Sequence, residues 1–314
     1  MSGEPSPTAR AWVSARRVPD FFIVGNPKSG TTALYEMLCQ QPRIFMPAVK
    51  EPHFFAGESA AAPERVPRTL DDYLALFAEA APGQLLGEAS PSYLRSRTAA
   101  ASIAALQPQA RIIAILREPA SFLRSMHLQM LQMHVETVED LGQALALEPA
   151  RPQPLLYSER VRYVEQLRRF GDVFRPENVL VLIYDDFRAD NEGTVRRVLD
   201  FLGVDDAVSV VAREANPTVR LRLKWLDDVI HGVSVGRGPV MKGVRLGVKA
   251  VTSRRLRHGA LGMRGSVVYG EPRAPDEQLM LELRRRFKGE VEALSDYLGR
   301  DLVTLWGYDN VIPG

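Results

Sequence analysis

The chain has 314 residues, of which 46% are hydrophobic and 25% are charged, as in a globular protein with a substantial core. Its net charge of +2 excludes a protein that attracts nucleic acid or anionic lipid through overall charge. The single cysteine, Cys39, excludes an intramolecular disulfide framework and a cysteine-based zinc cluster, and we expect its thiol to be buried and inert.

The chain shows no membrane-spanning or secretory pattern. No apolar run approaches the ~20 residues that a transmembrane helix needs. Residues 1–18 lack the apolar centre of a signal peptide. We therefore expect a flexible N-terminal tail over residues 1–18, a single domain over residues 19–314 and a cytoplasmic protein.

Short apolar runs alternate with helical patterns along most of the chain. The runs predict central strands of a parallel sheet at 21–25, 85–89, 111–116 and 179–184, because strands covered on both faces are apolar on both faces. The helical patterns cover 31–40, 119–133, 157–174 and 193–202, and a last helix follows Asp276. This order predicts an α/β fold: a doubly wound parallel sheet of the P-loop type, flanked by helices on both faces.

Residues 220–271 differ from the rest. They are rich in glycine, and between Arg220 and Arg264 they contain eleven Lys/Arg residues against two acidic ones. A segment of this length without clear periodicity is usually functional or disordered. We expect it to cover a bound anionic ligand, with one or more of four arginines taking part: Arg254, Arg255, Arg257 and Arg264.

The first strand leads into a glycine-bounded turn and then a helix. The turn reads Gly25-Asn26-Pro27-Lys28-Ser29-Gly30-Thr31-Thr32. Backbone N–H groups of such a turn and of the helix N-terminus bind phosphate. In ATP-binding loops the lysine follows the second glycine, whereas here it precedes it by two residues. The displaced lysine argues against a kinase that uses Mg-ATP. Such a kinase stays the alternative, with Asp185 and Asp186 as its candidate metal ligands.

Two separated motifs together resemble one enzyme family. The sequence PKSGTTAL at 27–34 resembles the 5′-phosphosulfate loop of sulfotransferases that use 3′-phosphoadenosine-5′-phosphosulfate (PAPS). Those enzymes also have a strand ending in R-x-P, with a serine eight residues after the arginine. Arg117, Pro119 and Ser125 reproduce that spacing. KEPHFF at 50–55 and GEASPSYL at 87–94 are similar to segments of the heparan-type and many bacterial members.

The resemblance implies a role for each matched residue. Arg117 and Ser125 would hold the 3′-phosphate, and Lys28 would stabilise the leaving 5′-phosphate. Glu51 would be the general base, and His53 is its rival because its pKa lies nearer neutral pH. Glu51 could instead be a surface carboxylate paired with Lys50. The complete cofactor-binding set is Lys28, Ser29, Gly30, Thr31, Thr32, Arg117 and Ser125, and the catalytic set is Glu51, Lys28 and His53.

The resemblance also implies an activity. We expect sulfuryl transfer from PAPS to a hydroxyl or amine of a small-molecule, glycan or natural-product acceptor in a bacterial enzyme. The product would be 3′,5′-adenosine bisphosphate (PAP), with no metal and no nucleic-acid partner. A homodimer is one expected state. A nucleotide-binding protein without catalysis is a further alternative. Glu88 and Tyr93 fit an acceptor site and ordinary packing equally well.

Overall fold

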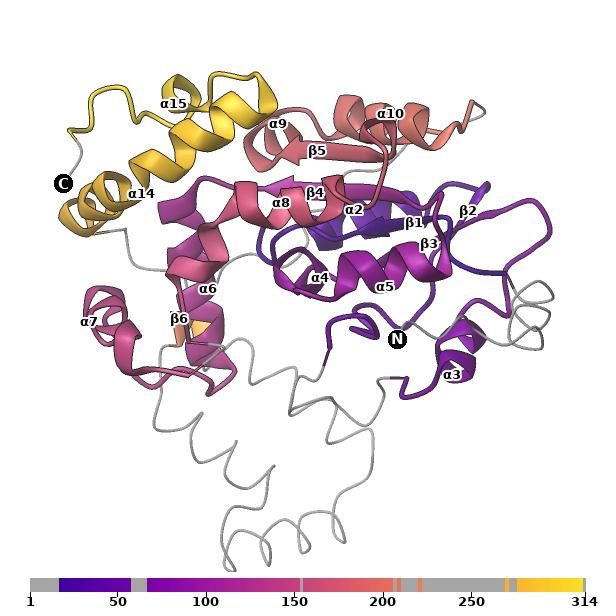
Figure 1. Cartoon of the computed structure of the whole chain (residues 1–314), viewed down its shortest axis with the longest axis horizontal. Helices are drawn as coiled ribbons and strands as arrows, with labels where there is room; N and C mark the ends of the chain where they lie inside the picture. The colour runs from indigo at the N-terminus through magenta and orange to yellow at the C-terminus, as the bar shows by residue number, and fades with distance from the viewer. Residues whose placement is uncertain are drawn as a thin grey trace, which may run out of the picture. The chain divides into compact units, whose positions relative to one another are not determined.

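A computed structural model of the chain describes residues 17–57, 67–152, 155–205, 208–209, 220–221, 269–270 and 276–312 (Figure 1). The first sixteen residues and Arg254, Arg255, Arg257 and Arg264 lie outside the described residues. The predicted tail and the predicted covering segment therefore remain predictions.

The centre of the fold is a parallel sheet of five strands in the order β2-β3-β1-β4-β5. All four predicted strands are confirmed, and β2 adds a two-residue strand at the edge. The strands are β1 Phe21–Ile23, β2 Ile44–Phe45, β3 Leu85–Ala89, β4 Arg111–Leu116 and β5 Val179–Ile183. The predicted doubly wound α/β fold is thus confirmed.

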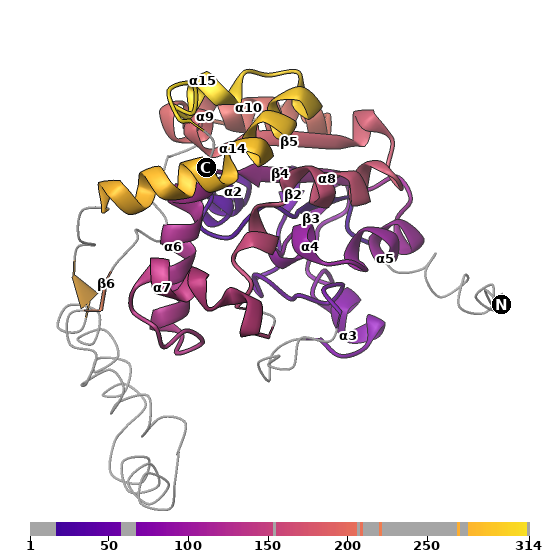
Figure 2. The same ribbon diagram turned by 60° about the vertical axis from the view of Figure 1, so that its left-hand side comes forward.

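Helices cover both faces of this sheet (Figures 1 and 2). One face packs against α2 (Thr31–Leu38) and α10 (Asn191–Leu202), whose apolar stripes join strand residues such as Ile23 and Ile113 in one buried cluster. The other face is covered by α4 (Ser92–Arg95), α5 (Ala99–Leu106) and α8 (Tyr163–Gly171). Because side chains alternate across a strand, two covered faces favour apolar residues at nearly every strand position, and the strands follow this rule except at residues such as Glu88 and Arg111.

The described residues fall into two compact units, divided within α6 (Pro119–Gln132) after Leu123. The first contains the sheet and the C-terminal helices. The second contains residues 124–146 with α7 (Leu141–Ala146) and an antiparallel pair, β6 (Arg220–Leu221) with β7 (Tyr269–Gly270). The remaining elements are α3 Leu70–Ala75, η1 Glu148–Ala150, η2 Ser158–Val161, η3 Pro176–Asn178, α9 Tyr184–Ala189, α14 Glu277–Leu298 and α15 Leu302–Leu305.

Two local predictions were wrong. The helix predicted over 157–174 is a 3₁₀ turn, η2, followed by α8, because Arg162 between them has φ −73° and ψ 63°, outside the helical region. Cys39 is exposed. The helix α2 ends at Leu38, so Cys39 becomes its C-cap and does not point into the core. Partial burial still raises the pKa of its thiol, which disfavours the reactive thiolate.

The last predicted helix is confirmed. α14 begins at Glu277, directly after Asp276. Its buried residues are Leu283, Phe287, Val291 and Leu294, whose spacings of four and three place them on one face of the helix. Within the described residues no helix is long and apolar enough to cross a membrane.

Candidate active site

The candidate residues lie beyond the carboxyl ends of three adjacent strands. Ile23 at the end of β1 pairs with Ala89 at the end of β3 on one side and with Ile113 of β4 on the other. The phosphate loop follows β1, and Arg117 follows β4. The loop with Glu51 is fixed to β3, because the Glu51 N–H donates to the Ala89 carbonyl at 3.1 Å. Ligands of open α/β sheets bind at this edge.

Two glycines give the phosphate loop its shape. At Gly25 a Cβ atom would lie 2.2 Å from the Ile115 backbone nitrogen, so only glycine allows β1 to leave the sheet this close to β4. Gly30 is the N-cap of α2 with φ 86°. A Cβ atom there would lie 2.8 Å from the Phe187 ring. Lys28 between them also has a positive φ, 61°, which is unusual for a residue with a side chain.

The loop presents backbone donors at the start of a helix. The first N–H groups of α2, from Thr31 on, have no partner within the helix, and Gly30 provides no side-chain cap. Thr31 and Ser29 are buried, whereas Thr32 is half-buried. The Ser29 hydroxyl lies 3.5 Å from the Pro27 carbonyl oxygen. The arrangement has the donors and the positive helix end that an anion requires.

Gly30→Ala should destabilise the fold by about 2 kcal/mol, because alanine is strained at this φ and its methyl group would press on the buried Phe187 ring. Gly83→Ala is the matched control: Gly83 has φ 83°, but no atom of the described residues lies within 4 Å of its Cβ position. That variant should lose only about 1 kcal/mol. Urea unfolding of both proteins measures the difference. Equal losses would show that the ring contact contributes nothing.

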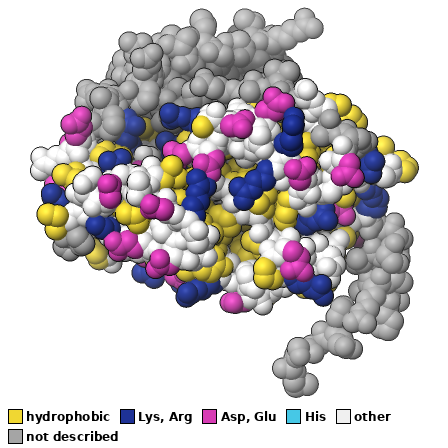
Figure 3. Space-filling model, turned by 90° about the horizontal axis from the view of Figure 1, so that it is seen from above, with side chains coloured by type: hydrophobic (Ala, Val, Ile, Leu, Met, Phe, Trp, Pro, Cys, Tyr) yellow, Lys and Arg dark blue, Asp and Glu magenta, His cyan; other side chains and the backbone are white. Residues whose placement is uncertain are grey.

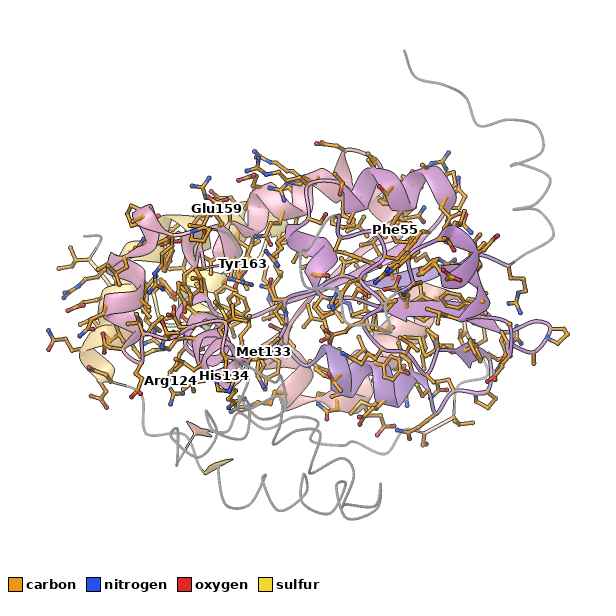
Figure 4. All side chains as sticks on the ribbon, turned by 90° about the horizontal axis from the view of Figure 1, so that it is seen from below. Phe55, Arg124, Met133, His134, Glu159 and Tyr163 are labelled. Atoms are coloured by element: carbon orange, nitrogen blue, oxygen red, sulfur yellow. The ribbon has the colours of Figure 1, made fainter. Side chains whose placement is uncertain are left out.

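Arg117 joins the phosphate loop to the strand beside it. Its Nη1 donates to the Lys28 carbonyl at 2.9 Å, and its guanidinium lies 4.8 Å from the centroid of the Tyr184 ring. Tyr163, which is labelled in Figure 4, is buried, and its hydroxyl donates to the Arg117 carbonyl at 2.8 Å. The guanidinium is therefore held by a stacking contact and a hydrogen bond. Among the described residues its other N–H groups have no hydrogen-bond partner, so they are available to an anion.

Lys28 and Arg117 bring two positive charges together in a partly buried place. Burial lowers the pKa of Lys28, and the charge of Arg117 lowers it further. An anion bound between the two side chains would relieve both effects, because it replaces lost hydration and offsets the repulsion. The electrostatics of the loop thus favour an anionic ligand.

Glu51 and His53 lie on one strained loop. Both have positive φ, 60° and 54°, and the Glu51 side chain is 39% exposed. Lys50 Nζ donates to one Glu51 carboxylate oxygen, and His53 Nε2 lies 3.6 Å from the other. Two left-handed non-glycine residues separated only by Pro52 mark a backbone that surrounding contacts must hold in place, as is common at functional sites.

His53 has a defined partner on each ring nitrogen. Its Nδ1 lies 2.7 Å from the Ser92 hydroxyl, and its Nε2 faces Glu51. Burial lowers the pKa of His53, with the Glu51 charge opposing this and the charges of Lys50 and Arg95 adding to it. The imidazole is therefore neutral at neutral pH, and its stabilising contribution is lost as pH falls through its lowered pKa.

The remaining predicted ligand is Ser125. It lies on α6, six residues beyond Pro119, in the second compact unit, and its exposed fraction is 3%. Its role with the 3′-phosphate stays a prediction.

The candidate metal ligands have structural partners. Asp186 accepts two bonds from Arg300, the second at 2.8 Å, and Asp185 accepts from the Trp306 indole at 2.9 Å. These contacts fix the C-terminal helices to α9. Among the described residues, no group of three His, Cys, Asp or Glu side chains could hold a metal ion.

Sequence reasoning missed Tyr184. It directly follows β5, the strand beside β4, so the rule that located Arg117 at a strand end would also have identified this ring as its neighbour.

The face shown in Figure 3 has acidic and basic side chains interspersed, in agreement with the small net charge.

Comparison with known proteins agrees with this geometry. The model of the sulfotransferase domain family matches residues 18–216, which include the phosphate loop, Glu51 and Arg117. The chain belongs to the sulfotransferase domain family. A solved sulfotransferase from Alicyclobacillus acidocaldarius is 31% identical, with a TM-score of 0.57, over 70% of this chain and 91% of that one.

Curated relatives of this sulfotransferase domain include human heparan sulfate glucosamine 3-O-sulfotransferase 6, 29% identical over 66% of this chain and 58% of the relative. Mouse carbohydrate sulfotransferase 15 is 27% identical over 60% of this chain and 44% of the relative. The chain spans about half the length of the curated relatives that it matches.

Proposed function

We propose that the protein transfers a sulfuryl group from PAPS to a hydroxyl or amine of a small-molecule, glycan or natural-product acceptor. The observation that carries the proposal is the hydrogen-bonded link between two cationic residues. Arg117 at the end of β4 is bonded to the carbonyl of Lys28 in the phosphate loop. PAPS has two phosphate positions, and a pair of joined cationic sites suits a ligand of that kind.

The loop residues fit the 5′ side of this donor. PAPS supplies the activated sulfuryl group. Lys28 and the N–H groups at the start of α2 would stabilise the negative charge that develops on the leaving phosphate. The depressed pKa of Lys28 supports this role, since a bound anion favours its charged form. Ser29, Thr31 and Thr32 are proposed as further donors.

Arg117 is proposed for the 3′-phosphate, with Ser125 as the second ligand that the sequence motif assigns. A guanidinium fork matches phosphate geometry better than an ammonium group does. The Tyr184 ring restricts the Arg117 side chain before any ligand arrives, which lowers the entropy lost on binding.

Glu51 is proposed as the general base. It is partly exposed, so an acceptor can reach it, and one of its carboxylate oxygens accepts a hydrogen bond from Lys50. The acceptor oxygen or nitrogen would bond to sulfur while its proton passes to the Glu51 carboxylate and the bond from sulfur to the phosphate oxygen breaks. Neutral His53 would orient Glu51 through Nε2. The pairing of Glu51 with Lys50 is compatible with this role.

The activity is tested by incubating the protein with ³⁵S-labelled PAPS and a panel of hydroxyl and amine acceptors that includes glycans and phenols. Labelled product with equimolar PAP, lost in Lys28→Ala, would support the proposal. PAP binding without transfer to any acceptor would favour a nucleotide-binding protein without catalysis. Phosphoryl transfer from Mg-ATP would replace the proposal with a kinase.

A further inference from the structure

We propose that Glu88 is a positioning residue, whose buried carboxyl group holds the loop of Glu51 and His53 in its strained conformation through the hydroxyl groups around it. The catalytic importance of that loop rests on the proposed function. The contacts from which the inference is argued are independent of the proposed function.

Glu88 is an acidic residue in the middle of the sheet. It lies on β3 opposite Phe22 of β1, and its exposed fraction is 0%. Burial of an unpaired charge is unfavourable in free energy, so a carboxyl group in the middle of a sheet is expected to have hydrogen-bond partners. Its Oε2 accepts from two phenols, Tyr73 at 2.6 Å and Tyr93 at 3.1 Å. Among the described residues its Oε1 has no hydrogen-bond partner.

The hydroxyl groups near Glu88 also bind the loop. Pro52 has no N–H, so residues 51–55 offer four backbone donors. Three of them bond to the segment that begins at Glu88: the Glu51 N–H to the Ala89 carbonyl, the His53 N–H to Ser90 Oγ and the Phe55 N–H to the Tyr93 hydroxyl. The distances are 3.1, 3.1 and 3.3 Å.

These bonds explain how the loop keeps two left-handed residues. A hydroxyl group that donates to a carboxylate is oriented with its lone pairs outward and accepts more strongly. Tyr93 donates to Glu88 and accepts from Phe55, so the carboxyl group, the phenol and the loop amide form one chain of bonds. The loop therefore depends on Glu88 although Glu88 does not touch Glu51.

The titratable groups that face Glu88 are the phenols of Tyr73 from α3 and Tyr93 from α4. Burial raises the pKa of Glu88 to about 7, and the hydroxyl groups of Ser90, Tyr73 and Tyr93 oppose that rise. The stability that this group contributes is therefore present at acid pH and is lost as pH rises from its unfolded pKa toward 7. A buried carboxyl group that lowers the stability of the fold as pH rises fits a residue that is retained because it orients its neighbours.

A pair of phenylalanine variants separates positioning from packing. Tyr93→Phe and Tyr73→Phe each remove one hydroxyl bonded to Glu88 Oε2 and keep the ring. Only the Tyr93 hydroxyl also holds a loop amide. The Tyr73 ring stacks on Phe54 at 4.7 Å, and phenylalanine preserves that contact. Glu88→Gln, a neutral isostere, tests the anchor itself.

The experiment is amide hydrogen exchange of residues 50–56 in the full chain, at equal global stability checked by urea unfolding. We expect exchange about five- to tenfold faster at Phe55 in Tyr93→Phe, and at Phe55 and His53 in Glu88→Gln. Tyr73→Phe should match the wild type. Equal acceleration in both phenylalanine variants, or none in Tyr93→Phe or Glu88→Gln, would overturn the proposal.

PAP release from PAPS with an acceptor from the panel gives a second readout. In Tyr93→Phe and Glu88→Gln, kcat should fall about tenfold or more with KM for PAPS unchanged, whereas Tyr73→Phe should keep both. A fall in kcat that is equal in all three variants would also overturn the proposal. If the wild type transfers nothing to any acceptor, the proposed function fails, and the exchange data still decide the role of Glu88.

Discussion

Glu51→Gln should lower kcat by about 10²- to 10⁴-fold and leave the affinity for PAP unchanged. Glutamine keeps the size of the side chain but cannot take a proton from the acceptor. The structure strengthens the assignment, because Glu51 is accessible and both of its carboxylate oxygens have defined neighbours, Lys50 and His53. The measurement is the rate of PAP release at saturating PAPS, with PAP binding followed separately by calorimetry.

Two further variants control this result. Glu165→Gln removes an exposed carboxylate on α8 that is paired with Arg169 and should leave kcat unchanged. His53→Gln removes the imidazole and should cost less than Glu51→Gln, since His53 orients the base in this account. If His53→Gln abolished transfer and Glu51→Gln retained it, His53 would be the base and the roles proposed for the two residues would be exchanged.

Arg117→Ala should weaken PAP binding by about 30- to 1000-fold, a loss of about 2–4 kcal/mol that is expected for a truncated charged partner of a phosphate. Binding of 5′-AMP should weaken much less, because it lacks the 3′-phosphate and would lose only the support that Arg117 gives to the Lys28 carbonyl. The preference for PAP over 5′-AMP should therefore disappear.

Arg111→Ala is the matched control for that variant. Arg111 lies at the opposite end of the same strand, β4, and its guanidinium also contacts an aromatic ring, that of Phe201 at 6.0 Å. Its loss should leave the preference for PAP intact. If Arg117→Ala kept the preference, or if Arg111→Ala lost it equally, the 3′-phosphate would be bound elsewhere.

The sequence predicted those parts of the fold that depend on local pattern. Strands such as Arg111–Leu116 are apolar at almost every position, and their carboxyl ends locate Arg117 without further information. The two-residue strand Ile44–Phe45 is too short to have a pattern. The break at Arg162 interrupts a run that has helical periodicity on both sides, so the periodicity concealed it.

The candidate site was predicted as a set of residues and not as a geometry. The motifs assigned Lys28 and Glu51, but their positive φ values are set by tertiary contacts that no spacing reveals. Tyr73 illustrates the same limit. It lies fifteen residues before Glu88 in a helix that was not predicted, yet it donates one of the two bonds to that carboxyl group.

The most direct test of the central claim is thermal unfolding with PAP, with 5′-AMP and with ATP plus magnesium. A ligand at a hundred times its dissociation constant adds about 2.7 kcal/mol to the free energy of unfolding, which gives a clear shift in Tm. We predict strong stabilisation by PAP, a weak effect of 5′-AMP and no requirement for magnesium. Stabilisation by ATP with magnesium and not by PAP would contradict the account.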